Sequence, residues 1–319
     1  MKLSIVVPCY NEEETIRPFL VATKQVESQM PDLSFEYIFI DDGSKDKTLA
    51  VLEEVGQTYP NVGYLSFSRN FGKEAALLAG LEHASGDLVT VMDVDLQDPP
   101  ELLIDMYAKI QEGYDVVGTR RKDRAGEPPI RSFFSRMFYV LINKVSDTEM
   151  VDGARDFRLM TRQVVDSILE LREVNRFSKG LFSWVGYKTT YLSFENRERV
   201  AGETSWNFFS LFKYSIEGIV NFSDVLLNLA TLGGFLSFAS SLVGIVFIIV
   251  RKLFFGGSVD GWPSLVCLIL FMGGLQLLAL GIIGKYISKI FLETKHRPVY
   301  IVRKSSGFQK WKREAVAEE

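Results

Sequence analysis

The chain has 319 residues, a formal net charge of −4 at pH 7 and an apolar content of 47%. This length suits one large domain or two smaller ones. The small net charge favours no particular partner, and we expect no nucleic acid to bind. The apolar content is slightly high for a soluble enzyme, and two stretches near the C-terminus carry the excess.

Residues 1–204 alternate between short apolar runs and amphipathic stretches. Continuous apolar strands separated by amphipathic helices indicate an α/β fold with a mostly parallel sheet covered on both faces. The first apolar run, at the N-terminus, is too short for a signal peptide and is interpreted as a strand. Strands are predicted at 3–7, 37–40, 62–67, 88–92 and 115–118, and helices at about 13–28, 46–58, 72–84 and 99–111.

Ligands of such sheets bind beyond the carboxyl ends of the strands. Each predicted strand does end in polar residues, and such turns suit phosphate or ribose because they open helices with free backbone N–H groups. No G-x-G-x-x-G or P-loop pattern occurs, which disfavours dinucleotide and Walker-type binding. The five turns read PCYNEEE, DDGSKDKT, SRNFGKEAA, DVDLQDPPE and GTRRKDR.

The fourth turn concentrates negative charge. Asp93 and Asp95 flank Val94, so in extended geometry their carboxylates lie on one face. Such close carboxylates raise each other's pKa, and a divalent cation removes the conflict. Mg²⁺ or Mn²⁺ suits these hard oxygen ligands, and Mg²⁺ completes its shell with water and substrate phosphates. The pattern therefore predicts a metal–diphosphate site; the alternative is a turn of solvated aspartates.

Residues 225–250 and 262–284 contain no charged residue. About 20 apolar residues span a bilayer core, so both stretches are predicted transmembrane helices joined by a short external loop, 251–261. The alternative is a pair of buried core helices. Basic residues are frequent in 285–319, which predicts a basic cytoplasmic tail and a cytoplasmic catalytic domain in a multi-pass cell-membrane protein. Homo-oligomer formation through the helices stays open.

Residues 205–224 are predicted to form an amphipathic helix at the membrane surface, because apolar residues recur every three or four positions. Packing of this helix against the catalytic domain explains the same pattern.

Four segments together resemble family 2 glycosyltransferases with the GT-A fold: IVVPCYNEEETI, FIDDGSKDKT, SRNFGKEAAL and DVDLQDPPE. With the two apolar stretches, they look like polyprenyl-phosphate glycosyltransferases, the group that contains dolichyl-phosphate mannose synthase and bactoprenol glucosyltransferases. The resemblance covers roughly residues 3–290. It implies a Rossmann-like GT-A catalytic domain over 1–204.

The resemblance also implies site residues. Its metal ligands are Asp93, Asp95 and Gln97. Alternative interpretations are packing under the sheet for Tyr10 and an Asx turn or helix cap for Asp42. The residues implied in nucleotide-sugar binding are Pro8, Tyr10, Asn11, Glu12, Asp41, Asp42, Arg69, Lys73, Asp93 and Arg120.

A basic segment, 119–136, follows the fifth strand. Most charge runs are solvated loops, but this one lies beside the predicted metal site and arginine suits phosphate. By the resemblance, Arg131 and Ser135 hold the acceptor phosphate. Arg199 and Ser205 support the diphosphate or the acceptor.

Asp156 stands where this family carries an aspartate that faces the sugar, so Asp156 and Asp95 are the implied catalytic residues. The alternative for Asp156 is a buried salt bridge with Arg158 or Arg155. A phosphate monoester has a second pKa of about 6, so the acceptor is largely ionised at neutral pH and needs no strong base. Asp156 as a base and Asp156 as an orienting group both stay open.

The expected reaction is an inverting, metal-dependent transfer of one sugar from a nucleotide-sugar to undecaprenyl phosphate at the inner membrane face. Glucose and uridine diphosphate are favoured by the resemblance, with N-acetylglucosamine, N-acetylgalactosamine and mannose (from GDP-mannose) as alternatives. A processive polysaccharide synthase is disfavoured because the chain lacks Q-x-x-R-W and has only two apolar stretches. A non-enzymatic scaffold is disfavoured by the aspartates and arginines.

Overall fold

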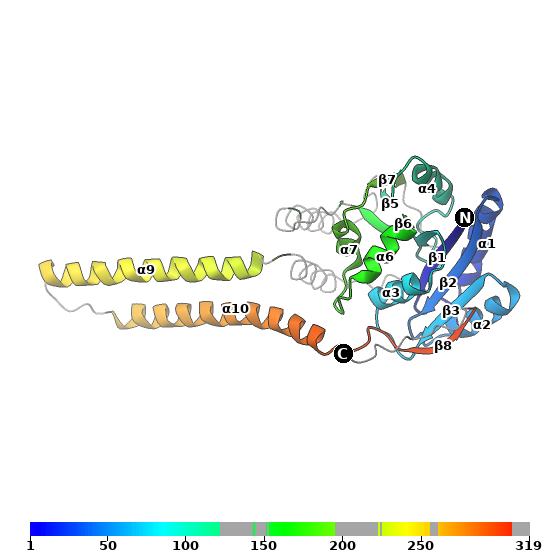
Figure 1. The fold of residues 1–319 in the computed structure, drawn as a ribbon. Coiled ribbons are helices and arrows are strands. Elements are labelled where there is room, and N and C mark those ends of the chain that lie inside the picture. Colours follow the sequence, from blue (N-terminus) through cyan, green and yellow to red (C-terminus); the bar gives the residue numbers. More distant parts are fainter. Residues whose placement is uncertain are drawn as a thin grey trace, which may run out of the picture.

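The computed structural model describes residues 1–121, 143, 151, 153–194, 223, 225–255 and 261–307. Within them, eight strands form one sheet in the order β7-β5-β6-β4-β1-β2-β3-β8 (Figure 1). Six strands run in one direction, and β6 and β8 run antiparallel to their neighbours. The strands are β1 (Lys2–Cys9), β2 (Ser34–Asp41), β3 (Val62–Phe67), β4 (Leu88–Val91), β5 (Val116–Arg121), β6 (Ala154–Thr161), β7 (Thr189–Phe194) and β8 (Val302–Ser306).

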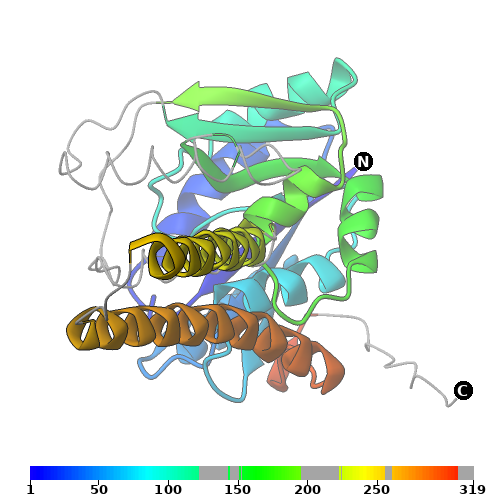
Figure 2. The ribbon, with the colours of Figure 1, turned by 90° about the vertical axis from the view of Figure 1, so that its left-hand side faces the viewer.

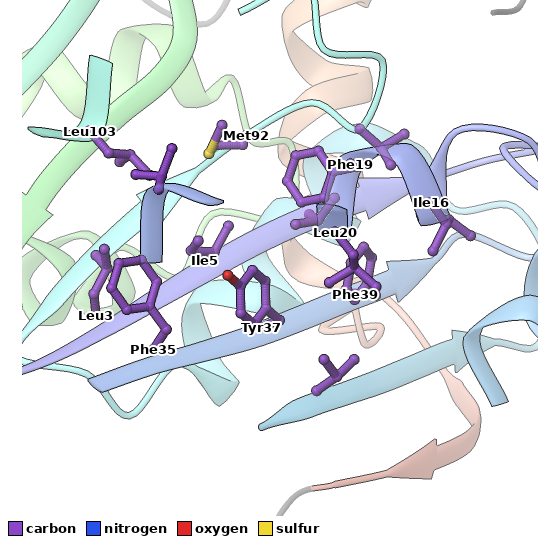
Figure 3. Close-up of a cluster of buried hydrophobic side chains, with 14 of the residues drawn as sticks. Leu3, Ile5, Ile16, Phe19, Leu20, Phe35, Tyr37, Phe39, Met92 and Leu103 are labelled. Atoms are coloured by element: carbon purple, nitrogen blue, oxygen red, sulfur yellow. The ribbon is translucent and has the colours of Figure 1, made fainter. Parts of the chain in front are cut away.

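Helices cover both faces of the sheet. Side chains of β1 alternate between the faces: Ile5 and Val7 join one buried cluster, and Val6 joins the other. The first cluster includes residues of α1 (Ile16–Gln29), α2 (Thr48–Thr58) and α4 (Leu102–Gln111), and Figure 3 shows its centre around Tyr37 and Phe39. The second includes residues of α3 (Lys73–His83), α6 (Arg162–Glu170) and α7 (Ser178–Trp184).

Each of the five predicted strands is present, and three further strands were missed. β6 carries charges at Arg155, Asp156 and Arg158, which interrupt the apolar pattern that marks a strand. β7 is half exposed and β8 is fully exposed at the edge of the sheet, so neither needs a continuous apolar sequence. β8 also corrects the predicted tail, because residues 302–306 belong to the sheet.

Two long apolar helices, α9 (Val225–Phe255) and α10 (Trp262–Thr294), lie side by side and project from the domain (Figures 1 and 2). Both are long and apolar enough to cross a membrane, over Leu227–Arg251 and Leu265–Thr294, with mean hydropathies of 2.2 and 2.5. Their apolar side chains are exposed, so the interpretation as buried core helices is wrong. Both helices extend beyond the predicted ends at 250 and 284.

The end of α10 is bonded to the domain that contains the sheet. The Glu293 carboxylate accepts hydrogen bonds from the backbone N–H groups of Val174 (3.0 Å) and Asn175 (3.0 Å). Lys289 Nζ donates to the Asn175 side-chain oxygen at 2.6 Å. Charged hydrogen bonds of this kind are among the stronger ones in proteins. They fix the base of the helix pair to the segment that precedes α7. The predicted amphipathic helix 205–224 lies outside the described residues, apart from Ser223.

Candidate active site

Hydrogen bonds join the turn that follows β1 to the turn that follows β2. Asn11 has a φ of 56°, its N–H donates to Ser44 Oγ, and its side-chain oxygen accepts the Lys45 N–H, both at 2.9 Å. The Glu12 N–H donates to Thr48 Oγ1 at 2.8 Å. These bonds form because neighbouring parallel strands bring their carboxyl ends to the same edge. The first two predicted turns therefore meet at one edge of the sheet, and their contact with a nucleotide stays a prediction.

Tyr10 lies in the turn that follows β1, with 42% of the residue exposed. Its interpretation as a residue packed under the sheet is therefore wrong. An exposed ring beside a polar turn is free to stack on a flat base. Pro8 is half-buried one residue before the end of β1 and pairs in register with Ile40. Contact of Tyr10 with a nucleotide stays a prediction.

Asp41 and Asp42 are both buried and both bind protein groups. Asp41 accepts hydrogen bonds from the Ser44 N–H (2.9 Å) and from Ser66 Oγ (2.7 Å). Asp42 accepts the N–H groups of Phe71 (2.6 Å) and Gly72 (2.9 Å). Burial raises the pKa of Asp42, although these two N–H groups oppose the rise.

The partners of Asp42 define its role in the structure: it holds the loop formed by residues 68–72, here called the Arg69 loop. Asp41 accepts the N–H three residues on, as a cap residue does, whereas Asp42 bonds to a distant loop, so the cap interpretation describes Asp41 better than Asp42. Contact of either aspartate with base or ribose stays a prediction.

Gly43 lies directly beneath the Arg69 loop. It has a φ of +67°, and a Cβ placed there would lie 2.3 Å from the Arg69 carbonyl carbon and 2.7 Å from the Asn70 nitrogen. A residue with a side chain would therefore be strained and would also push the loop away.

Gly43→Ala should lower the free energy of unfolding by about 3 kcal/mol, the sum of left-handed strain and steric overlap. Gly113→Ala is the matched control, because Gly113 has a φ of +88° but nothing within 4 Å of its added Cβ. The control should lose only about 1 kcal/mol. Chemical denaturation of both proteins measures the difference, and equal losses would show that the loop does not press on Gly43.

The acidic turn after β4 meets α3 and β6. Lys73, the first residue of α3, places its Nζ 2.7 Å and 3.0 Å from the two oxygens of Asp93 and 2.6 Å from Asp156 Oδ2. Asp156 reaches this point because β6 runs antiparallel to β4, with Val91 opposite Arg158. One ammonium thus joins the first aspartate of the turn to the predicted catalytic aspartate.

The charge of Asp156 follows from these neighbours. Burial alone would raise the pKa of its carboxyl, but the ammonium groups of Lys73 and Lys179 lower that pKa well below its usual range. Desolvation lowers the pKa of Lys73, and Asp156 and Asp93 raise it by more. Asp156 is therefore anionic and Lys73 cationic throughout the physiological range.

The alternative interpretation of Asp156 named a salt bridge with Arg155 or Arg158, but in the structure the Asp156 carboxylate pairs with Lys73. Arg158 is buried, and its guanidinium carbon lies 3.8 Å from the centre of the Phe182 ring. The same guanidinium donates hydrogen bonds to the main-chain oxygens of Asp156 and Arg155. Arg158 therefore supports the backbone of β6, while the Asp156 carboxylate pairs with Lys73.

Arg155 holds the rest of the acidic turn. Its Nε lies 3.0 Å from Asp98 Oδ1, and its NH2 lies 3.2 Å from Gln97 Oε1. Burial raises the pKa of Asp98, although Arg155 opposes the rise, and the second oxygen of Asp98 is buried without a hydrogen-bond partner. Leu96 has a φ of 56°, a strained conformation that the turn imposes. The Gln97 oxygen, predicted as a metal ligand, binds Arg155 here.

Comparison with known proteins identifies the family of this chain. The family model "Glycosyl transferase family 2" matches residues 4–169. The chain belongs to glycosyltransferase family 2. Relatives include a bactoprenol glucosyl transferase of Shigella phage SfV, 44% identical over 304 residues (95% of this chain, 98% of the relative). A prophage bactoprenol glucosyl transferase homolog of Escherichia coli K12 is 41% identical over 304 residues (95% and 99%).

Among solved structures, a mannosyltransferase of Pyrobaculum calidifontis in complex with GDP-Man and Mn²⁺ matches with a TM-score of 0.49 at 16% identity. The match covers 89% of this chain and 86% of that one. The family and the mixed, mostly parallel sheet agree with the GT-A fold expected from the motifs.

The carboxylates of this glycosyltransferase suit a divalent cation by their chemistry. Asp93 and Asp95 offer hard oxygen atoms just after the end of β4. In the same turn, Asp98 Oδ2 is buried and has no hydrogen-bond partner. Within the described residues, no group of three or more His, Cys, Asp or Glu is arranged to hold a metal. Mg²⁺ needs only one or two carboxylates when substrate phosphates complete its shell, so the donor set fits.

Asp98, Arg155 and Lys179 neighbour the predicted site residues but were not predicted as site residues themselves. Asp98 is the third acid of the turn, and that spacing was a usable signal. Arg155 was considered only as a salt-bridge partner of Asp156, and Lys179 gave no signal, because their positions depend on β6 and α7. The start of α7 is fixed by Glu74, whose carboxylate accepts the Ser178 N–H at 2.9 Å.

The remaining predicted site residues are two exposed arginines and four residues for the acceptor phosphate. Arg120, on β5, is exposed and donates to Ser193 Oγ at 2.9 Å. Arg69 is exposed, and its guanidinium lies 4.0 Å from the centre of the Phe71 ring. The four predicted acceptor-phosphate residues lie outside the described residues: Arg131, Ser135, Arg199 and Ser205.

Proposed function

We propose that this glycosyltransferase moves one sugar from a nucleotide-sugar to a polyprenyl phosphate at the membrane surface, with inversion at the anomeric carbon. The observation that carries the proposal is the Lys73 ammonium held between Asp93 and Asp156, on a domain bonded to the second of the two apolar helices. The names of the relatives support the acceptor, since several are bactoprenol glucosyl transferases over nearly their full length.

The donor is proposed to bind across the carboxyl ends of β1, β2 and β4. The exposed ring of Tyr10 stacks on the base, and the Arg69 loop covers the nucleotide. Lys73 then pairs with the diphosphate instead of with both carboxylates, because a doubly charged phosphate group attracts the ammonium strongly. A uridine nucleotide and glucose are the favoured groups, since the relatives are named as glucosyl transferases.

Asp93 and Asp95 are the residues that would hold Mg²⁺ or Mn²⁺. The cation, when bound, offsets negative charge on the departing nucleoside diphosphate. The chain's own cations, Lys73 on α3 and Arg155 on β6, both contact this acidic turn and add to the positive field there.

The transfer itself needs no proton. An acceptor phosphate oxygen supplies the electron pair for the new bond to the anomeric carbon, and the nucleoside diphosphate leaves with the electrons of the old bond. The acceptor's second pKa is about 6, so its oxygen is already anionic at neutral pH. A carboxylate with a strongly lowered pKa is a weak base, so Asp156 orients the sugar and stabilises positive charge that develops on it. An α-linked donor gives a β-linked product.

The apolar helices bring the acceptor to this site. A polyprenyl chain stays in the bilayer, so its phosphate can be reached only by a domain held at the membrane surface. Glu293 and Lys289, near the end of α10, hold the domain at that place. The cytoplasmic face is proposed from the excess of basic residues that follow position 284.

The test is a donor panel with the purified full-length protein. Undecaprenyl phosphate is incubated with Mn²⁺ or Mg²⁺ and with UDP-glucose, UDP-N-acetylglucosamine, UDP-N-acetylgalactosamine or GDP-mannose. The lipid mass should increase by one sugar with one donor, UDP-glucose being favoured. Undecaprenol without phosphate is the control and should gain nothing. Lipid of unchanged mass with every donor contradicts the proposal, and a ladder of masses indicates a processive synthase.

A further inference from the structure

The chain returns to the catalytic domain after α10 and contacts the end of β3. The Tyr300 ring stacks on Phe67, with ring centres 4.9 Å apart and planes at 18°, and the Tyr300 hydroxyl bonds to Glu82. The next residue, Ile301, accepts the Ser68 N–H at 2.9 Å. β8 then pairs antiparallel with β3. The segment beyond the second apolar helix is therefore part of the catalytic sheet (Figure 1).

The Tyr300 contact continues into the Arg69 loop. Phe67 is the last residue of β3 and is buried, and its ring meets Phe71 edge-on at 5.8 Å. The Arg69 guanidinium lies 4.0 Å from the centre of the Phe71 ring. A row of ring contacts thus runs from Tyr300 through Phe67 and Phe71 to Arg69. Each contact of this type contributes a modest, geometry-dependent attraction.

The Arg69 loop has few other restraints. Ser68, Arg69 and Asn70 are exposed, so burial does not fix their conformation. On one side, Asp42 holds the loop through two backbone N–H groups. On the other side, the loop depends on Ile301 and on the ring row that begins at Tyr300. An exposed loop with two anchors loses order when one anchor is removed.

We propose that Tyr300 is a positioning residue for the donor: together with Ile301 it holds the Arg69 loop in its nucleotide-binding conformation and links that loop to α10. The inference rests on the proposed function, in which the Arg69 loop covers a nucleotide. Tyr300 acts through Phe67 and Phe71. Because α10 leads directly into this segment, the placement of the membrane helices contributes to the order of the donor site.

The test compares three variants of the full-length protein. Tyr300→Leu removes the stacked ring, Tyr300→Phe keeps the ring and removes the hydroxyl, and Lys304→Ala breaks the ion pair of β8 with Glu53 at 2.5 Å. Hydrogen exchange is measured on residues 68–72. Binding of free UDP and the kinetics for donor and acceptor are measured on the same samples.

Tyr300→Leu should exchange about tenfold faster at 68–72, bind UDP about five- to tenfold more weakly, and raise the donor KM by the same factor. Its kcat and acceptor KM should stay within about twofold of wild type, because the reacting groups are untouched. Tyr300→Phe and Lys304→Ala should keep wild-type exchange and donor KM. If the substitution instead unfolded part of the domain, kcat would fall and the KM values for donor and acceptor would both rise.

Phe71→Leu is a further variant that removes the last ring of the row and leaves the C-terminal segment intact. It should reproduce the effect of Tyr300→Leu, and the double variant should be no worse than either, because both break the same row. Unchanged exchange at 68–72 in Tyr300→Leu, or strictly additive effects in the double variant, would overturn the inference. Failure of wild type to bind UDP or GDP would count against the proposed function, while the exchange result still tests the Tyr300 contact.

Discussion

Asp95→Asn should lower the rate of sugar transfer by about 100- to 1000-fold, the typical loss when one preorganised charge-stabilising group is removed. Asp95 is only 7% exposed, and its Oδ1 accepts the Gln97 N–H at 3.2 Å. An asparagine oxygen can accept the same bond, so the turn keeps its shape while the negative charge is lost. The variant should therefore fold normally and bind Mn²⁺ much more weakly.

The measurement is the initial rate of lipid-product formation, together with the Mn²⁺ affinity of the purified protein. Asp105→Asn is the matched control, because Asp105 is an exposed acid on α4 away from the turn. The control should stay within about twofold of wild type. A rate above one-tenth of wild type in Asp95→Asn would contradict the role of this carboxylate.

Asp156→Asn should lower kcat by a similar factor and leave the affinity for free UDP within about twofold, because Asp156 is proposed to face the sugar. The pH dependence separates its role from that of a titrating base. The folded-state pKa of Asp156 is strongly lowered, so its carboxylate stays charged as pH falls towards 5. The acceptor phosphate, with its second pKa of about 6, is the group that protonates in this range.

Wild type should therefore lose rate below about pH 6, and Asp156→Asn should show the same acidic limb at a lower overall rate. Rates from pH 5 to pH 8, at saturating donor, give the comparison. If the acidic limb disappeared in Asp156→Asn, Asp156 would be the titrating group, and the orienting role would be wrong.

The five strands and the turns after them were predictable because they are local. A run of β-forming residues such as 88–91 identifies a buried strand, and the three aspartates after it identify a charged turn. The edge at which these turns gather follows from the parallel arrangement alone. The alternative that Tyr10 packs under the sheet failed because the β1 turn carries its ring outward.

The contacts within the site were not predictable in the same way. The Lys73–Asp156 pair joins residues 83 positions apart and exists only because β6 lies antiparallel beside β4. β6 itself was hidden by its charged residues, and with it the clamp of Arg155 on Asp98. Asp42 was predicted to meet the nucleotide, but its role as anchor of the Arg69 loop depends on the close approach at Gly43.

Strand β8, in the C-terminal segment, was also not predictable from a local pattern. Residues 302–306 read VRKSS, a polar sequence typical of a solvated tail, and they become a strand because the edge of β3 offers unpaired backbone groups. Only the tertiary position of α10 brings the segment to that edge.

A structure of the full-length protein with Mn²⁺ and UDP would test the metal–diphosphate site directly. We expect anomalous signal from Mn²⁺ beside Asp93 and Asp95, the diphosphate next to it, and Lys73 turned from Asp156 towards the phosphates. A diphosphate bound away from residues 93–98, with Lys73 still between Asp93 and Asp156, would contradict this placement of the site.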